Sequence, residues 1–335
     1  MKKFSKIIGI ALLSLTIFSC SDDDNNTPAQ QTIAGIANSN PELSTLVTAL
    51  NRTGLTATLN GSGQYTVFAP TNAAFTTFFA SISTPTNVVT VNNVDVNVLK
   101  AILLNHVIGS EIKSTAIPAA TYASTLSPIN ATTNAPTISM FVQKAGATVT
   151  LNGGVDSKGA VVTTADVDAS NGVIHIVNRV VQIPTLVDHV VDNPDFDTLQ
   201  AVVTSESGAF GDQSAVFDAL DGLTAAAPAT LFAPNNAAFT AATTGTGFAV
   251  GATAAQVTKV LQYHATTAGN VRSSQLTNNQ VIPMITSPVL NVTAILGTGT
   301  VDIKDTQNIL SRVFQADIQA SNGVIHGVTK VLRPF

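Results

Sequence analysis

The stretch TVFAPTNAAFT (66–76) returns almost unchanged as TLFAPNNAAFT (230–240), and the two copies organise the whole chain. Three further blocks repeat in the same order around them: TIAGIANSNPELSTLVTAL (32–50) with TLVDHVVDNPDFDTLQAVV (185–203), LLNHVI (103–108) with LQYHAT (261–266), and ADVDASNGVIHIVNRVV (165–181) with ADIQASNGVIHGVTKVL (316–332). A separation of roughly 150 residues indicates two complete domains and not a solenoid of short repeats. We expect the domains to cover residues 32–183 and 184–335, because a strand pattern stops at Pro184.

Composition excludes several classes of protein. Of the 335 residues, 45% are hydrophobic and only 10% are charged, against about 25% in an average globular protein. The apolar content excludes a disordered chain. The net charge of −5 and the lack of a basic patch argue against a nucleic-acid partner. A single cysteine excludes an internal disulfide framework and a thiolate-rich zinc site.

The early part of each unit has helical patterns. Asn40 is expected to cap a helix that carries Pro41 in its first turn and that Gly54 ends. Its apolar positions recur with helical spacing and predict one buried face: Leu43, Leu46, Val47 and Leu50. A buried strand is predicted over 65–69, with Thr71 or Asn72 capping the helix after it. A further helix is expected to bury one face: Val98, Leu99, Ile102, Leu103 and His106.

The later part of each unit changes to strand patterns. Apolar residues alternate with polar ones around Ile138, Met140 and Val142. Asn171-Gly172, repeated as Asn322-Gly323, predicts a hairpin with a type I′ turn, which needs positive φ at both central residues. Helices before strands in each unit predict an α+β class with an antiparallel-rich sheet or sandwich and packed helices.

The N-terminus has the pattern of an export signal. Lys2, Lys3 and Lys6 precede a short apolar run (7–18), too short to span a bilayer. The run ends at Cys20 and resembles a bacterial lipoprotein signal, in which that cysteine is lipidated; a plain secretory peptide is the alternative. We therefore expect a signal peptide over 1–19 and a lipidated Cys20 with an acidic linker over 20–31. The acidic residues behind the cysteine also resemble the surface-export signal of Bacteroidetes lipoproteins.

The repeated blocks resemble the ordered signature of the fasciclin domain family. The motifs are TVFAPTNAAF, NHVI and SNGVIHIVNRVV in the first unit, with LFAPNNAAF, YHAT and SNGVIHGVTKVL in the second. The resemblance implies two tandem fasciclin-like domains, each a wedge-shaped antiparallel-rich β-sandwich with packed helices. It also implies adhesion or binding to extracellular matrix, without catalysis.

The family's adhesive motif, a tyrosine-histidine pair flanked by branched aliphatics, gives the candidate binding residues. By this resemblance they are Tyr263 and His264 in the second domain, and Asn105 and His106 in the first. Asn105 replaces the tyrosine of the motif. Ala265 and Thr266 replace the aliphatics in the second domain, so both copies depart from the pattern.

Four histidines pair across the repeats, which predicts a structural role inside each domain: His106 with His264, and His175 with His326. Asp166 and Asp317 lie nine residues before His175 and His326 and are placed to orient the imidazole, as two members of a nucleophilic constellation. No nucleophile motif accompanies them, so an enzyme is the least favoured class. His189, near Asp188 and Asp192, is expected on a solvated helix face and not as a metal ligand. We expect no metal and no cofactor.

Together these patterns predict a lipid-anchored outer-membrane protein, exposed on the cell surface, that mediates adhesion or biofilm association. The expected partners are extracellular polysaccharide or cell-surface and matrix proteins, with membrane contact only through the lipid. A carbohydrate-capture module of a polysaccharide uptake or degradation system is the main alternative. A periplasmic location and a structural spacer also remain open.

Overall fold

The structure of the protein is a computed structural model that describes residues 30–204, 212–244 and 251–335. Residues 31–335 form one compact unit that contains both sequence repeats. We call 31–183 the first half and 184–335 the second half. The predicted signal peptide, Cys20 and all but the last two residues of the predicted linker lie outside the described residues.

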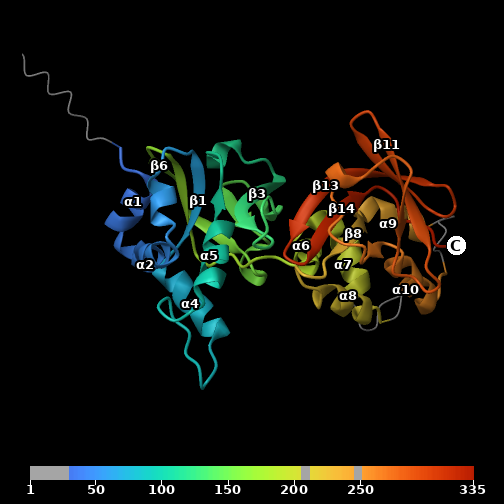
Figure 1. Cartoon of the computed structure of the whole chain (residues 1–335), viewed down its shortest axis with the longest axis horizontal. Coiled ribbons are helices and arrows are strands. Elements are labelled where there is room, and N and C mark those ends of the chain that lie inside the picture. Colours follow the sequence, from blue (N-terminus) through green and yellow to red (C-terminus); the bar gives the residue numbers. More distant parts are fainter. Residues whose placement is uncertain (1–29, 205–211, 245–250) are drawn as a thin grey trace, which may run out of the picture. The chain divides into compact units, whose positions relative to one another are not determined.

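The first half begins with helices and ends with strands (Figure 1). Its helices are α1 (Ile33–Ser39), η1 (Pro41–Leu43), α2 (Ser44–Thr53), α3 (Thr56–Asn60), α4 (Asn72–Ile82), α5 (Val96–Asn105), η2 (Ser114–Ala116) and η3 (Gly154–Asp156). Its strands are β1 (Tyr65–Pro70), β2 (Val107–Ile108), β3 (Ala120–Pro128), β4 (Thr137–Ala145), β5 (Thr148–Leu151), β6 (Ala160–Ala169) and β7 (Gly172–Val177). The seven strands close into a barrel in the order β1 to β7, in which only β1 and β7 pair in parallel.

The second half repeats this plan. Its helices are α6 (Leu186–Asp192), η4 (Pro194–Phe196), α7 (Asp197–Thr204), α8 (Ser214–Asp221), α9 (Asn236–Thr243), α10 (Ala254–Gln262) and η5 (Ser273–Gln275). Its strands are β8 (Ala229–Pro234), β9 (Ala265–Thr266), β10 (Gln280–Pro283), β11 (Asn291–Gly297), β12 (Thr300–Lys304), β13 (Leu310–Ala320) and β14 (Gly323–Val328). They form an open sheet in the order β10-β11-β12-β13-β14-β8-β9, with β8 and β14 in parallel.

The helix boundaries follow the predicted caps. The Asn40 side chain accepts from the N–H of Glu42 at the start of η1, and Gly54 ends α2 with a φ of 73°. Thr71 caps α4 by accepting from the N–H of Ala74. The Asn40 and Thr71 side chains each satisfy a backbone N–H that a helix start leaves unpaired, and the Gly54 N–H bonds to the last carbonyl groups of α2.

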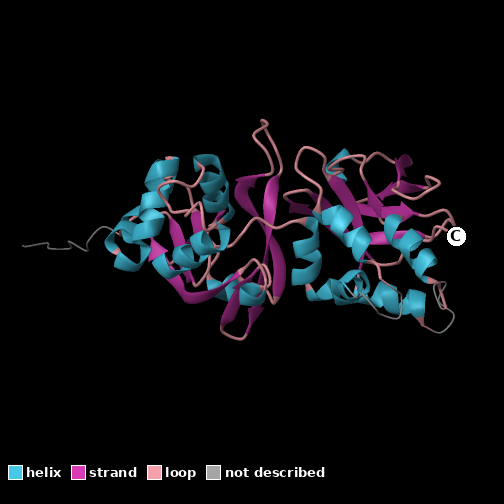
Figure 2. Cartoon of the chain, turned by 90° about the horizontal axis from the view of Figure 1, so that it is seen from below, coloured by secondary structure: helices cyan, strands magenta, loops and turns pink. Residues whose placement is uncertain are grey.

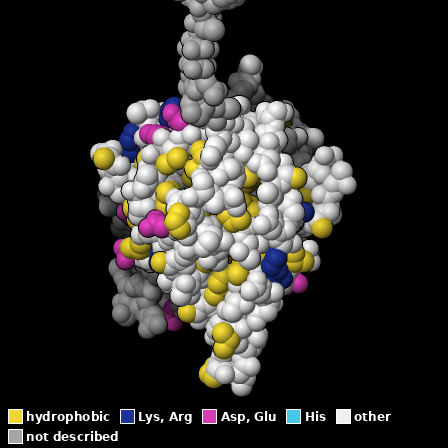
Figure 3. Space-filling model, turned by 90° about the vertical axis from the view of Figure 1, so that its left-hand side faces the viewer, with side chains coloured by type: hydrophobic (Ala, Val, Ile, Leu, Met, Phe, Trp, Pro, Cys, Tyr) yellow, Lys and Arg dark blue, Asp and Glu magenta, His cyan; other side chains and the backbone are white. Residues whose placement is uncertain are grey.

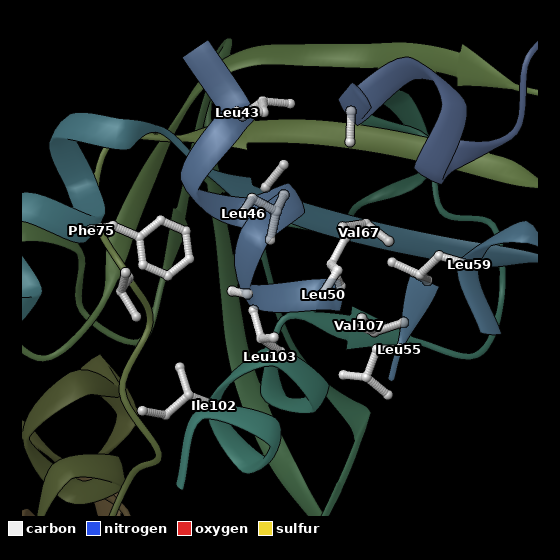
Figure 4. Close-up of a cluster of buried hydrophobic side chains, with 14 of the residues drawn as sticks. Leu43, Leu46, Leu50, Leu55, Leu59, Val67, Phe75, Ile102, Leu103 and Val107 are labelled. Atoms are coloured by element: carbon white, nitrogen blue, oxygen red, sulfur yellow. The ribbon is translucent and has the colours of Figure 1, made fainter. Parts of the chain in front are cut away.

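Helices and strands separate within each half and bury two apolar clusters (Figure 2). In the first half, one cluster lies between the helices and the sheet and includes Leu46, Phe75 and Leu103 (Figure 4). The other fills the barrel interior around Phe68, Met140 and Val142, with Met140 fully buried. The second half has the same two clusters. The predicted face of α5 is correct except for Val98, whose side chain is exposed.

The predicted hairpin is present, but its turn differs from the prediction. Ala169 pairs with Gly172, so the central turn residues are Ser170 and Asn171, and neither has a positive φ. Gly172, at φ 137°, follows the turn. A Cβ at Gly172 would lie 1.9 Å from the carbonyl oxygen of Tyr65. Glycine is therefore required here for close approach of two strands and not for a type I′ turn.

The Asn171 side chain shows why the turn is shifted. Its Oδ1 accepts from the N–H of Ile33 at the start of α1, and its Nδ2 donates to the carbonyl oxygens of Leu59 and Gly61. Asn322 makes the equivalent bonds to Leu186 and Leu220 in the second half. The asparagine thus fastens the hairpin to the helices.

Candidate functional site

A serine, an aspartate and a histidine come together at the edge of the first barrel. The Ser114 hydroxyl donates to Asp166 Oδ2 over 2.5 Å, and the Ser114 N–H donates to Asp166 Oδ1 over 2.7 Å. The Asp166 N–H donates to His175 Nδ1 over 3.2 Å. The predicted proximity of Asp166 and His175 is therefore correct, although the contact is made by the backbone of Asp166. The nearest carboxylate oxygen is 4.0 Å from the imidazole.

The arrangement does not fit nucleophilic catalysis. His175 Nδ1 accepts the Asp166 N–H, so the ring proton is assigned to Nε2, which donates to the carbonyl oxygen of Ile112 over 3.0 Å. Both ring nitrogens are occupied, and the Ser114 hydroxyl points to the carboxylate instead of the imidazole. Burial lowers the pKa of His175 and favours the neutral ring. A serine nucleophile needs a free imidazole nitrogen beside its hydroxyl, which this cluster does not provide.

The second half contains the same cluster. Ser273 donates to Asp317 through its N–H and its hydroxyl, and the Asp317 N–H donates to His326 Nδ1. His326 Nε2 lies 2.9 Å from the carbonyl oxygen of Val271. Asp166 and Asp317 both have a φ of 59°. The repetition indicates that the cluster is a clamp. It holds the connection before β3 in the first half, and the connection before β10 in the second half, against the last hairpin of that half.

The serines of this clamp were not among the residues predicted from the sequence. Ser114 follows Lys113, and Ser273 follows Arg272, at matching places in the two repeats. That shared basic-serine pair is the signal that identifies them. The clamp therefore joins three segments of each half. In the first half, Asp166 and His175 lie in a repeated block, and Ser114 lies outside the repeated blocks.

The histidines of the predicted adhesive motif lie inside the core. His106 and His264 are 2% and 3% exposed. His106 Nδ1 lies 2.7 Å from the carbonyl oxygen of Ile102, and its Nε2 accepts the N–H of Val181. His264 makes the same pair of bonds with Val260 and Leu332. Burial lowers the pKa of both residues to about 4, so both rings are neutral at pH 7.

Their predicted neighbours are buried as well. The Tyr263 hydroxyl donates to the carbonyl oxygen of Asn291 over 2.7 Å and accepts the N–H of Thr306. Asn105 Nδ2 donates to the carbonyl oxygens of Val181 and Gln182. Each copy of the motif thus packs the end of its helix, α5 or α10, against the last residues of the same half. Direct binding by these four side chains stays a prediction.

The prediction of a solvated His189 is wrong. His189 is fully buried, its ring packs edge-on against Tyr122, and Nε2 lies 3.4 Å from the carbonyl oxygen of Gln319. Its Nδ1 has no hydrogen-bond partner among the described residues. Burial lowers the pKa of His189 to about 4. The helix face that carries it is covered by β3 and β13, which lie far away in sequence.

Asp192, on the same helix, is also buried and not solvated. Ser157 donates to Asp192 Oδ1 over 2.5 Å, while Oδ2 has no partner among the described residues. Burial raises the pKa of Asp192 to about 6. Lys158 pairs with Asp188 at 3.0 Å. These contacts join the first half to α6.

In residues 30–204, 212–244 and 251–335, no three His, Cys, Asp or Glu side chains converge as metal ligands do. Nor does any helix in these ranges have the length and apolar character needed to cross a membrane.

Comparison with known proteins identifies the repeats. The profile of the Fasciclin domain family matches residues 41–184 and 204–334. Protein sll1483 of Synechocystis is 34% identical over 161 residues, which cover 47% of this chain and 77% of that protein. A solved FAS1 domain pair from the insect cell adhesion molecule Fasciclin I shares the fold with a TM-score of 0.50 at 18% identity, covering 87% of this chain and 96% of that one.

Two mycobacterial proteins are similar over a shorter stretch. Immunogenic protein MPB70 of Mycobacterium bovis is 42% identical over 90 residues, which cover 25% of this chain and 42% of that protein. Cell surface glycolipoprotein MPB83 of the same species is 42% identical over 88 residues, which cover 25% of this chain and 37% of that protein. The similarity spans less than half of either relative.

Proposed function

The chain belongs to the fasciclin domain family, and on that premise we propose that it is a non-catalytic adhesion protein of the cell surface. The observation that carries the proposal is the family match over both repeats. The partners that we propose are extracellular polysaccharide or cell-surface and matrix proteins, as in biofilm association.

The geometry of the polar clusters supports a binding role over a catalytic one. The hydroxyl of Ser114, the carboxylate of Asp166 and both nitrogens of His175 are engaged in bonds within the domain. Binding is therefore assigned to the outer faces of the two domains. Two domains on one chain raise avidity when both engage a partner.

The surface composition fits contact with neutral polymers. The face in Figure 3 carries few charged side chains and is mostly uncharged polar atoms and backbone, with scattered apolar residues. Such a face repels neither an acidic nor a basic partner strongly. It offers many hydroxyl and amide groups for hydrogen bonds.

The proposed anchor is a lipid on Cys20, with residues 21–31 as a tether to the outer membrane. The signal-like pattern that ends at Cys20 supports this anchor. The name of MPB83, a cell surface glycolipoprotein, supports a surface location for this chain by similarity.

Protease treatment of intact cells tests the location. Native protein and a Cys20→Ala variant are expressed in parallel, and proteinase K is added before and after the outer membrane is opened. We expect the native protein to be degraded on intact cells and the variant to be lost from the membrane fraction. Protection of the native protein until the membrane is opened would place it in the periplasm. Capture of small carbohydrates would then be favoured over adhesion.

A further inference from the structure

A cleft of about 740 Å³ opens on the first barrel where β2 and β3 separate. These strands pair only at Ile108 and Thr125. Beyond that bridge, residues 109–112 and 116–118 form one wall of the cleft, and 121–126 of β3 form the other. The volume lies in the range of about 300–1,000 Å³ that is typical of ligand sites.

The β3 wall presents backbone groups that have no partner in the sheet. The Asn152 N–H donates to the Phe141 carbonyl oxygen, and the Phe141 N–H donates to Asn152 Oδ1, so the backbone of Phe141 faces β5. Hydrogen-bonding direction alternates along an antiparallel pair. Tyr122, which lies opposite Phe141, therefore points its N–H and C=O away from β4 and toward the cleft. Among the described strands Tyr122 has only Phe141 as a ladder partner, and neither of its backbone groups joins a turn or loop hydrogen bond there.

The remaining lining defines the chemistry of an occupant. The floor is apolar and includes Phe68, Ile117 and Val142, which belong to the barrel interior. Glu111 is exposed at the rim, and the neighbouring Lys113, which interacts with its charge, forms its ion pair with Asp168 instead. No lysine or arginine lines the cleft. The charge thus favours a cationic occupant over an anionic one.

We propose that this cleft binds an extended peptide segment of a partner protein, which pairs with the free edge of β3 at Tyr122. Apolar side chains of the peptide pack against the partly buried Ile112 and Ala123, and a basic side chain reaches Glu111. An open strand edge beside an apolar pocket is the arrangement by which a peptide adds a strand to a sheet.

This inference rests on the proposed function and names a kind of partner for it. The test selects binders of the soluble fragment 31–335 from a displayed library of random peptides of about ten residues, the length of a long strand. Ala116, exposed on η2 in the cleft wall, is changed to Trp to fill the cleft without disturbing the core. Gln275→Trp at the matching place on η5 is the control for an added surface aromatic.

We expect selected peptides to carry alternating apolar residues and a lysine or arginine. Ala116→Trp should weaken their binding at least about tenfold, which corresponds to about 1.4 kcal/mol, while Gln275→Trp leaves it unchanged. N-methylation of alternate peptide amides should abolish binding, because it removes the strand hydrogen bonds. Glu111→Lys should weaken binding about two- to fivefold, as for an exposed ion pair.

Three results would overturn the inference: a library that yields no binder, binders that tolerate Ala116→Trp, and binders that tolerate N-methylation. Adhesion by another face of the molecule would survive Ala116→Trp. If only the cleft proposal is wrong, the native chain still supports adhesion. If the proposed function is wrong, the native chain does not support adhesion either, so the two failures are distinguishable.

Discussion

Replacing His189 with isoleucine should reduce the loss of stability that the buried histidines cause as the pH falls. The folded pKa of His189 is lowered to about 4 by burial, against 6.5 for an ordinary histidine. The unfolded chain therefore binds a proton below pH 6.5 that the folded chain cannot bind until about pH 4. The stability that this residue contributes is complete above pH 6.5 and is lost as the pH falls toward 4.

The magnitude follows from the two pKa values. Between pH 7 and pH 5, His189 should remove about 2 kcal/mol from the free energy of unfolding. Whole domains are stable by only about 5–15 kcal/mol, so this loss is measurable. Asp192 acts in the opposite direction, because its pKa is raised to about 6 and its protonation stabilises the fold as the pH falls. That contribution is common to wild type and variant and cancels in the comparison.

The chain itself suggests the substitution. The first repeat has Ile36 at the position of His189 and packs it against its core. His189→Ile should therefore fold, and it removes the unpartnered Nδ1. Urea unfolding followed by circular dichroism gives the free energy of unfolding of each protein at pH 7 and at pH 5, and the two values are compared. Val187→Ile on the same helix is the control. An identical loss of stability in wild type and His189→Ile would show that His189 does not contribute to the pH dependence.

Three further substitutions test the internal architecture. Ser114→Ala should destabilise the chain by about 1–2 kcal/mol in urea unfolding, because a hydroxyl bond to the Asp166 carboxylate is lost; an ester-hydrolysing activity that disappears in this variant would contradict the clamp. Gly172→Ala should cost more than about 3 kcal/mol, because its Cβ would meet the Tyr65 carbonyl oxygen at 1.9 Å. Gly146→Ala, also at positive φ but with open space around it, should cost only about 1–2 kcal/mol. Equal effects at the two glycines would exclude the close approach as the reason for Gly172.

Features set by local sequence were predictable, and those set by distant contacts were not. Asn40, Gly54 and Thr71 act on backbone groups within a few residues, so their roles are written in the adjacent sequence. His189 has the sequence surroundings of a solvated helix face, but Tyr122 and Gln319 cover it from other strands.

The same distinction holds for the hairpin and the candidate site. Asn171 followed by glycine predicts a hairpin correctly, but bonds from its side chain to Ile33 and Leu59 determine which residues form the turn. The pairing of His175 with Asp166 was predictable from their spacing across one hairpin. The participation of Ser114 depends on a segment more than 50 residues away from Asp166, outside the repeated blocks.

Adhesion of whole cells shows whether the protein is an adhesin of the cell surface. A strain lacking the protein is compared with strains that carry the native chain or Cys20→Ala, and aggregation and attachment to a matrix-coated surface are measured with and without soluble fragment 31–335. We expect deletion to reduce adhesion and only the native chain to restore adhesion. The soluble fragment should compete with the native chain and lower adhesion. Normal adhesion of the deletion strain, with no effect of added fragment, would contradict the account.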